Sequence, residues 1–205
     1  MISVELKRVT PDSEGIIEEA YRLCYGSEPR YGEAGRKFIA SKVALGHESP
    51  LEHASATFLL QGSRSFSHQL VRHRLASYSQ QSQRYVKENN FKWVLPPTIQ
   101  SNQAAYDKFV SAMNDTRIAY ELLVADGIPK EDARYVLPNA CETKIMMTAD
   151  FREWRHFIEL RADKHAQWEI REVARLVLEQ LYKEAPSVFE DLYKKFVGEP
   201  QGAVE

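Results

Sequence analysis

Residues 54–86 contain no aspartate or glutamate, although the chain carries 29 acidic residues in 205. An even distribution would place about five acids in a segment of that length. The same segment holds basic side chains and interleaved hydroxyls, namely Arg64, His68, Arg72, His73, Arg74, Arg84, Ser77, Ser79 and Ser82. Guanidinium and hydroxyl donors without competing carboxylates favour a phosphate or a similar anion as ligand. A solvated basic face paired with distant acids is the simpler interpretation for any single arginine.

Arg72, His73 and Arg74 are adjacent in this segment. On a helix, three consecutive side chains point in three directions, so one surface network of ion pairs would not use all of them. The triplet therefore predicts several ligands or several subunits around this point of the chain.

A second concentration of chemistry follows a helical stripe. Its members are spaced three, four, three and four residues apart, namely Phe151, Trp154, Ile158, Arg161 and His165. The stripe begins apolar, so it carries the guanidinium of Arg161 toward the interior, where an unpaired charge is costly. Arg161 therefore needs a bound anion or carbonyl, or a buried ion pair with Asp163 or Glu169. Arg152 and His156 are expected beside this stripe.

Neither a metal site nor a cysteine nucleophile is predicted. Cys24 and Cys141 are far apart and lack the spacing of metal ligands, so both are interpreted as small, reduced core residues. Residues 47–53, with a histidine at each end, superficially resemble a metalloprotease helix, but Pro50 and the spacing exclude that helix. Ser82 has no carboxylate in its segment to orient a base, so we expect it to contact a ligand through its hydroxyl.

Periodicity predicts the elements that must position these residues. Alternating apolar residues predict strands over residues 2–6 and 54–60. Asp12 or Ser13 is expected to cap the first helix through its side chain. Helical spacing predicts helices over residues 13–26, 33–45, 65–74, 102–125 and 129–133, and from Asp150 onward with breaks near Asp163 and at Pro186. Residues 77–83 are too rich in hydroxyls for a helix interior and are expected to form a loop.

The predicted class is α+β, mainly helical, with a small antiparallel or mixed sheet. Residues 1–205 are predicted to form a single domain with a loose tail over residues 198–205. With 27 basic and 29 acidic residues and a net charge of −2, no global field favours nucleic acid or anionic lipid. No apolar run approaches the roughly 20 residues of a membrane span, and no signal peptide is seen. We expect a soluble cytoplasmic protein.

The motif of the acid-free segment is specific. Arg72, His73, Arg74, Ser77, Ser82 and Arg84 match the pattern R-H-R-x-x-S-x-x-x-x-S-x-R. The chain thereby resembles flavin-dependent thymidylate synthases. Residues 46–53, 133–138 and 160–169 are similar to family segments in the same order, so the resemblance spans most of the chain.

This resemblance implies reductive methylation of dUMP to dTMP. The carbon donor would be 5,10-methylenetetrahydrofolate, the redox cofactor FAD and the reductant NADPH. It also implies a homotetramer with active sites at subunit interfaces. Partners would be the small molecules dUMP and folate, with no nucleic acid and no membrane.

Residue by residue, the resemblance divides the chemistry into three groups. The dUMP contacts would be Gln69, Gln80, Ser82, Gln83, Arg84, Arg134 and Arg161. The FAD contacts would be Ser49, Glu52, Arg72, His73, Arg74, Arg152, His156 and His165, and His47 would lie near the folate. Arg84 and Arg134 would hold the phosphate, and Arg161 would be catalytic by stabilising negative charge on the pyrimidine. Gln80 stands where several relatives carry Glu, and Asp150 where some carry Asn.

Two other functions fit parts of the pattern. A noncatalytic nucleotide-binding or RNA-binding module would grip phosphates with the acid-free segment and stack a base on Tyr78 or Tyr85. The pI of about 6.3 counts against it. A structural helical oligomer would pair its arginines across interfaces and would gain no stability from ligands.

Overall fold

The computed structural model describes residues 2–198, so the predicted tail lies outside the described residues except for Gly198. The described chain forms two compact units. Unit 1 comprises residues 2–3, 61–71 and 79–145, and unit 2 comprises residues 4–60, 72–78 and 146–198. The prediction of a single domain stays a prediction.

Four strands form one antiparallel sheet in the order β1-β2-β4-β3. They are β1 (Ser3–Val9), β2 (Ser55–Ser63), β3 (Ala76–Gln80) and β4 (Glu142–Asp150). Two contacts fix the register of β2 against β4. The hydroxyl oxygens of Thr57 and Thr148 lie 2.8 Å apart, and the Arg64 N–H donates to the Cys141 carbonyl at 2.9 Å. Together with the helices, this sheet confirms the α+β class.

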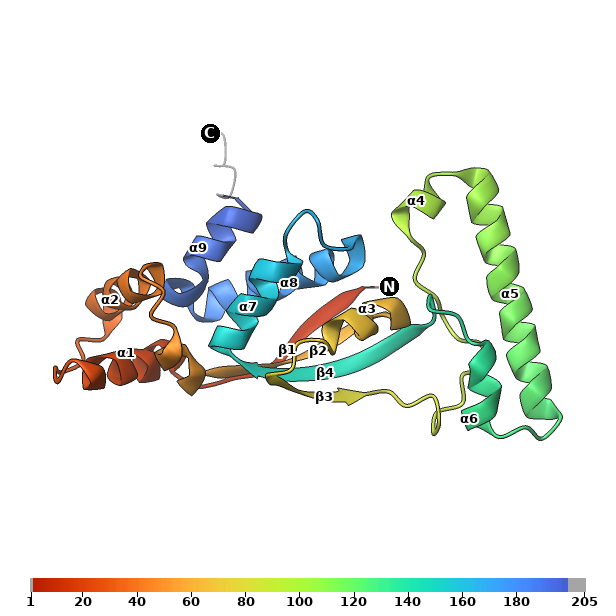
Figure 1. The fold of residues 1–205 in the computed structure, drawn as a ribbon, viewed down its shortest axis with the longest axis horizontal. Helices are drawn as coiled ribbons and strands as arrows, with labels where there is room; N and C mark the ends of the chain where they lie inside the picture. Colours follow the sequence, from red (N-terminus) through yellow and green to blue (C-terminus); the bar gives the residue numbers. More distant parts are fainter. Residues whose placement is uncertain (1, 199–205) are drawn as a thin grey trace. The chain divides into compact units, whose positions relative to one another are not determined.

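The core of unit 2 is rich in buried aromatic side chains, and Figure 1 shows the helices that surround it. The helices are α1 (Ser13–Cys24), α2 (Gly32–Ala44), the 3-10 helix η1 (Ser49–His53), α7 (Phe151–Arg161), α8 (Trp168–Glu184) and α9 (Pro186–Phe196). The Trp154 indole N–H donates to the Ala56 carbonyl at 3.1 Å, and its ring lies 5.0 Å from that of Phe58. Both rings are fully buried, so α7 is fixed on β2 by apolar burial and a satisfied indole.

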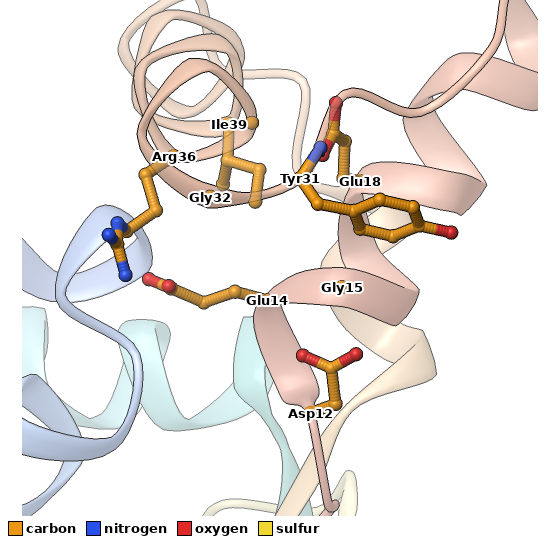
Figure 2. A pocket seen from close by; sticks show the side chains of 9 residues that line it. Asp12, Glu14, Gly15, Glu18, Tyr31, Gly32, Arg36 and Ile39 are labelled. Carbon is orange, nitrogen blue, oxygen red and sulfur yellow. The ribbon is translucent and has the colours of Figure 1, made fainter.

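A buried carboxylate holds α1 against the start of α2. Nine residues line the cavity of about 100 Å³ between them, namely Asp12, Glu14, Gly15, Glu18, Tyr31, Gly32, Gly35, Arg36 and Ile39 (Figure 2). Glu18 accepts from the backbone N–H groups of Arg30 at 2.9 Å and Tyr31 at 2.8 Å. Burial opposes ionisation of Glu18, but these donors, together with Arg22, hold its pKa below the usual value. A Cβ at Gly35 would clash with the Glu18 carboxylate, so a larger residue there would force this side chain to move.

Unit 1 contains the longest described helix. Its helices are α3 (Arg64–Leu70), α4 (Pro97–Gln100), α5 (Gln103–Ala125), α6 (Lys130–Ala133) and the 3-10 helix η2 (Arg134–Val136). Figure 1 shows α6 beside the C-terminal end of α5. Side chains cap two of these helices, because Ser63 accepts from the Phe66 N–H and Asn102 from the Ala105 N–H, each at 3.0 Å. Within residues 2–198, none of the helices has the length and apolar character that crossing a membrane requires.

The structure corrects four local predictions. The helix predicted over residues 65–74 ends at Leu70, and residues 76–80, expected as a loop, form β3. Strand formation there depends on pairing with β4, which local polarity does not reveal. Asp12 occupies the N-cap of α1 at φ 48° and makes no capping hydrogen bond, because its carboxylate lies over Gly15. Cys141 is buried as expected, but Cys24 is exposed.

Candidate functional site

His73 is the centre of a buried polar cluster in unit 2. It lies in the irregular segment between α3 and β3, and its side chain is only 1% exposed. The Nε–H of Arg161 donates to His73 Nε2 at 3.0 Å. His73 Nδ1 lies 3.4 Å from Oε1 of Glu153. Because Nε2 accepts, the ring is neutral and carries its proton on Nδ1, where it faces Glu153.

Burial shifts the pKa values of three groups in this cluster. Desolvation, followed by the charges of Arg161 and His156, lowers the pKa of His73 to about 4. Desolvation raises the pKa of Glu153. Desolvation and the nearby Glu153 also raise the pKa of Tyr78, whose hydroxyl donates to the His73 carbonyl at 2.7 Å, to about 12. At neutral pH, His73 is therefore an uncharged imidazole beside a cationic Arg161.

Helix α7 carries Arg161 to this cluster as its last residue. Phe151, Trp154 and Ile158 of the predicted stripe are fully buried, which confirms the stripe as far as Arg161. His165 does not belong to it, because α7 ends at Arg161. The Asp163 side chain accepts from the His165 backbone N–H at 2.9 Å, which favours a turn over a further helical turn. The His165 side chain is 83% exposed.

A cavity of about 620 Å³ lies beside the cluster. Its lining residues are Glu48, Glu52, Leu75, Asp150, Arg152, Glu153 and His156. Three predicted flavin contacts, Glu52, Arg152 and His156, are thus brought together. Arg152 Nη1 donates to Glu52 Oε1 at 2.6 Å. His156 contacts the His73 ring edge-on, with ring centroids 5.8 Å apart.

Arg72 and Arg74 flank buried His73 and are both exposed. A helix was predicted here, but the segment is not helical. The side chains therefore alternate in direction, inward at His73 and outward at its two neighbours. Within residues 2–198, neither arginine forms a hydrogen bond or an ion pair with another side chain. Leu75, the next residue, lines the large cavity.

A second cavity of about 300 Å³ in unit 2 contains His47 and Ser49. It shares Glu48 and Arg152 with the larger cavity. The predicted folate contact therefore lies in the same hollow as a predicted flavin contact. The Tyr21 hydroxyl donates to the His47 carbonyl, which anchors the backbone at this point.

In unit 1, the two arginines predicted to bind phosphate both contact the same residue. Arg84 Nε donates to the Glu131 carboxylate at 2.6 Å, and Arg134 Nε donates to the Glu131 carbonyl at 3.0 Å. Lys130 also donates to the Tyr85 carbonyl at 2.8 Å. These bonds tie the loop after β3 to α6. The Arg84 side chain is 57% exposed, so an anion from solvent can compete for it.

The predicted glutamine contacts in unit 1 have partners of their own. The Gln80 amide donates to Ser67 Oγ at 2.9 Å and to Thr143 Oγ1 at 3.2 Å, and the Gln83 amide to Cys141 Sγ at 3.7 Å. Burial raises the pKa of the Cys141 thiol to about 12, so it is not a nucleophile at neutral pH. The remaining contacts are local: Gln69 donates to the Ser65 carbonyl and Ser82 accepts from the Arg84 N–H.

Three residues at these positions were not predicted: Glu131, Glu153 and Arg155. Arg155 forms two bonds of 2.7 Å to Asp191 on α9, and its Nε donates to Glu48 at 3.2 Å. It thus fixes Glu48, which lines both cavities of unit 2. The partners of these residues are distant in sequence, so no local pattern pairs them. Of the three, only Glu153 has a local sequence signal, because the Asp150–Glu153 spacing is typical of a helix start.

Comparison with known proteins agrees with the motif. Residues 5–187 match the family described as thymidylate synthase complementing protein. A flavin-dependent thymidylate synthase of Geobacter sulfurreducens is 47% identical, over 93% of this chain and 86% of that protein. Proteins of the same name from Clostridium tetani and Nitratidesulfovibrio vulgaris are 40% and 44% identical. The matches cover 92% and 91% of this chain, and 85% and 84% of those proteins.

Proposed function

We propose a function for this chain from one premise: it belongs to the family of flavin-dependent thymidylate synthases. It catalyses the reductive methylation of dUMP to dTMP, with 5,10-methylenetetrahydrofolate as carbon donor, FAD as redox cofactor and NADPH as reductant. The observation that carries this proposal is the half-buried Arg161, held by neutral His73 at the end of the helix whose first turn lines the large cavity. A cation fixed in this way suits a reaction that develops negative charge.

The residues of unit 2 fit FAD. Arg72 and Arg74 are exposed and suit a diphosphate, which guanidinium groups bind through paired hydrogen bonds. Glu52, Ser49 and His165 provide acceptors and donors for hydroxyl groups, and Arg152 and His156 line the cavity. A cavity of about 620 Å³ is within the usual range for cofactor sites. The chemistry that bound FAD supplies is the transfer of reducing equivalents from NADPH to the pyrimidine.

The arginines of unit 1 suit the dUMP phosphate. Arg84 and Arg134 already converge on Glu131, so a phosphate can replace that carboxylate as the partner of Arg84. Gln69, Gln80, Ser82 and Gln83 provide amide and hydroxyl groups for the sugar and base. Arg161 stabilises negative charge on the pyrimidine, so the chain needs no nucleophile of its own.

The assembly and the folate site belong to the same proposal. His47 lies near the folate, in the hollow it shares with Ser49. The protein acts as a cytoplasmic homotetramer with its active sites at subunit interfaces. The outward-pointing Arg72 and Arg74 support this arrangement, because they are available to a neighbouring subunit or its ligand.

The test is the complete reaction. Purified protein is incubated with FAD, dUMP, methylenetetrahydrofolate and NADPH, and dTMP is measured by chromatography alongside NADPH oxidation. We expect the wild type to form dTMP. The Arg161→Ala variant should keep its melting temperature and its flavin, but its turnover should be at least about 100-fold slower. Arg175→Ala, which changes an exposed arginine on α8, is the matched control.

Two results contradict the proposal. A wild type that forms no dTMP with all four components would refute the activity. Near-normal turnover by Arg161→Ala would leave the activity standing and remove the role given to Arg161.

A further inference from the structure

We propose that Glu153 is a positioning residue that acts through His73 to fix the guanidinium of Arg161. The proposal rests on the proposed function for the role of Arg161. It assigns a task to Glu153 that the resemblance does not. It also gives the His73 side chain a structural task in addition to its expected flavin contact.

The three side chains lie in a row, with a hydrogen bond between Arg161 and His73 and a close contact between His73 and Glu153. A guanidinium only donates, so His73 Nε2, 3.0 Å from Arg161 Nε, must accept. A neutral imidazole with an accepting Nε2 carries its proton on Nδ1, and that proton needs an acceptor. Glu153 Oε1, 3.4 Å from Nδ1, is placed to accept it. Glu153 thus selects the tautomer of His73 that can hold Arg161, as a carboxylate orients histidine in metal and catalytic sites.

The anchor at Glu153 is itself rigid. Glu153 occupies the third position of α7, where its backbone N–H donates to the Asp150 side chain at 2.8 Å. In the usual capping box, a glutamate at this position reaches back to the N-cap amide. Here its carboxylate lies against His73 instead. Its side chain is 7% exposed, so its contact with His73 is sheltered from water.

The ring between the two ends is also fixed. Phe157 packs edge-on against His73 with ring centroids 5.1 Å apart. The Tyr78 hydroxyl holds the His73 carbonyl at 2.7 Å. Because Arg161 is held through Nε, the plane of its guanidinium and the direction of its terminal NH₂ groups are set. A misdirected charge-stabilising group loses most of its effect, so this restraint matters for turnover.

The experiment compares two substitutions at one position. Glu153→Leu removes the acceptor with little change in size, whereas Glu153→Gln keeps a carbonyl oxygen that can accept from Nδ1–H. Glu159→Leu is the matched control, because Glu159 is an exposed residue of α7 that pairs only weakly, at 3.4 Å, with Lys195. The readouts are ¹⁵N NMR of labelled histidines, flavin content and the kinetics of dTMP formation.

We expect the wild type and Glu153→Gln to carry the His73 proton on Nδ1. In Glu153→Leu the proton moves to Nε2, where it opposes the Arg161 donor. The kcat of Glu153→Leu falls about 10–100-fold, while Glu153→Gln stays within about threefold of the wild type. The control variant keeps wild-type kcat, and flavin content is unchanged throughout.

Three outcomes overturn the proposal. The first is a wild type with the His73 proton on Nε2, which needs no variant to detect. The second is a Glu153→Leu variant with wild-type kcat. The third is a Glu153→Gln variant whose kcat falls as far as that of Glu153→Leu. That result would show that the site needs the negative charge of Glu153, or that both substitutions disturb the fold. Failure of the proposed function is distinguishable, because it abolishes wild-type dTMP formation without moving the His73 proton.

Discussion

The arginines of the two units differ in how they are held. In unit 1, Arg84 is 57% exposed and contacts a single carboxylate on a short helix. In unit 2, Arg155 is 9% exposed and is bound by Asp191, Glu48 and the Val188 carbonyl. An exposed ion pair is worth little and exchanges easily, whereas a buried one is costly to break. Exposure therefore separates arginines that can exchange their partner for a ligand from arginines that maintain the geometry of a site.

Breaking the Arg155 cluster should have the largest effect. Arg155→Met removes three hydrogen-bonded partners of one guanidinium, namely Asp191, Glu48 and the Val188 carbonyl. We therefore expect the free energy of unfolding to fall by about 2 kcal/mol in urea denaturation. Arg152→Met, which breaks a pair whose side chains are 51% and 48% exposed, should cost less than about 1 kcal/mol. Equal decreases in the free energy of unfolding for the two variants would contradict the distinction between buried and exposed arginines.

The exposed arginines of unit 1 should affect binding and not stability. Arg84→Ala is expected to weaken dUMP binding about 10–100-fold in calorimetry, because a guanidinium bond to phosphate is lost. Its melting temperature should stay at the wild-type value. Arg84→Lys should recover part of the affinity, since it keeps the charge but not the fork. A variant that melts early and binds dUMP normally would place Arg84 among the structural arginines.

Acid should weaken unit 2 through His73. Because its pKa falls from 6.5 in the unfolded chain to about 4 in the folded protein, the unfolded state binds the proton more readily. The stability contribution is complete above pH 6.5 and is lost as the pH falls toward 4. As the pH falls from 6.5 to 4, the free energy of unfolding of His73→Gln should decrease by about 1–2 kcal/mol less than that of the wild type. Parallel stability profiles for the two proteins would contradict a neutral, buried His73.

The smallest expected effect concerns Glu131. Its carboxylate binds Arg84, where the proposed function places the dUMP phosphate. Glu131→Gln should therefore tighten dUMP binding about two- to fivefold, and less at high salt. Titration of the variant at two ionic strengths measures this. Weaker binding by Glu131→Gln would show that the carboxylate organises the arginines and does not compete with the ligand.

Local patterns predicted the parts of the fold that local interactions determine. The helices α1, α2 and α5 follow apolar spacing with Gly26, Gly46 and Gly127 beyond their ends, and their bounds agree closely with prediction. The apolar stripe of α7 was predicted correctly through Ile158, and it brings the half-buried Arg161 to the buried His73. The interruptions near Asp163 and at Pro186 were also correct.

Long-range pairing determined what the sequence did not reveal. The polar segment Ala76–Gln80 forms a strand because β4 pairs with it, and β4 itself was not predicted although its buried residues alternate. Arg161 and His73 are 88 residues apart, and Arg84 and Glu131 are 47 apart. The basic members of these pairs stood out by their motif, whereas Glu153 and Glu131 are ordinary helix residues until the fold brings them to their partners.

The proposed function requires this chain to bind FAD and dUMP at the residues described. The most direct test is the visible absorption spectrum of the protein after incubation with FAD and desalting, repeated with increasing dUMP. We predict a retained flavin band that shifts on addition of dUMP, because the proposed function requires the nucleotide to bind next to the flavin. Absence of retained flavin at every FAD concentration would contradict the claim and favour a binding module or a structural oligomer.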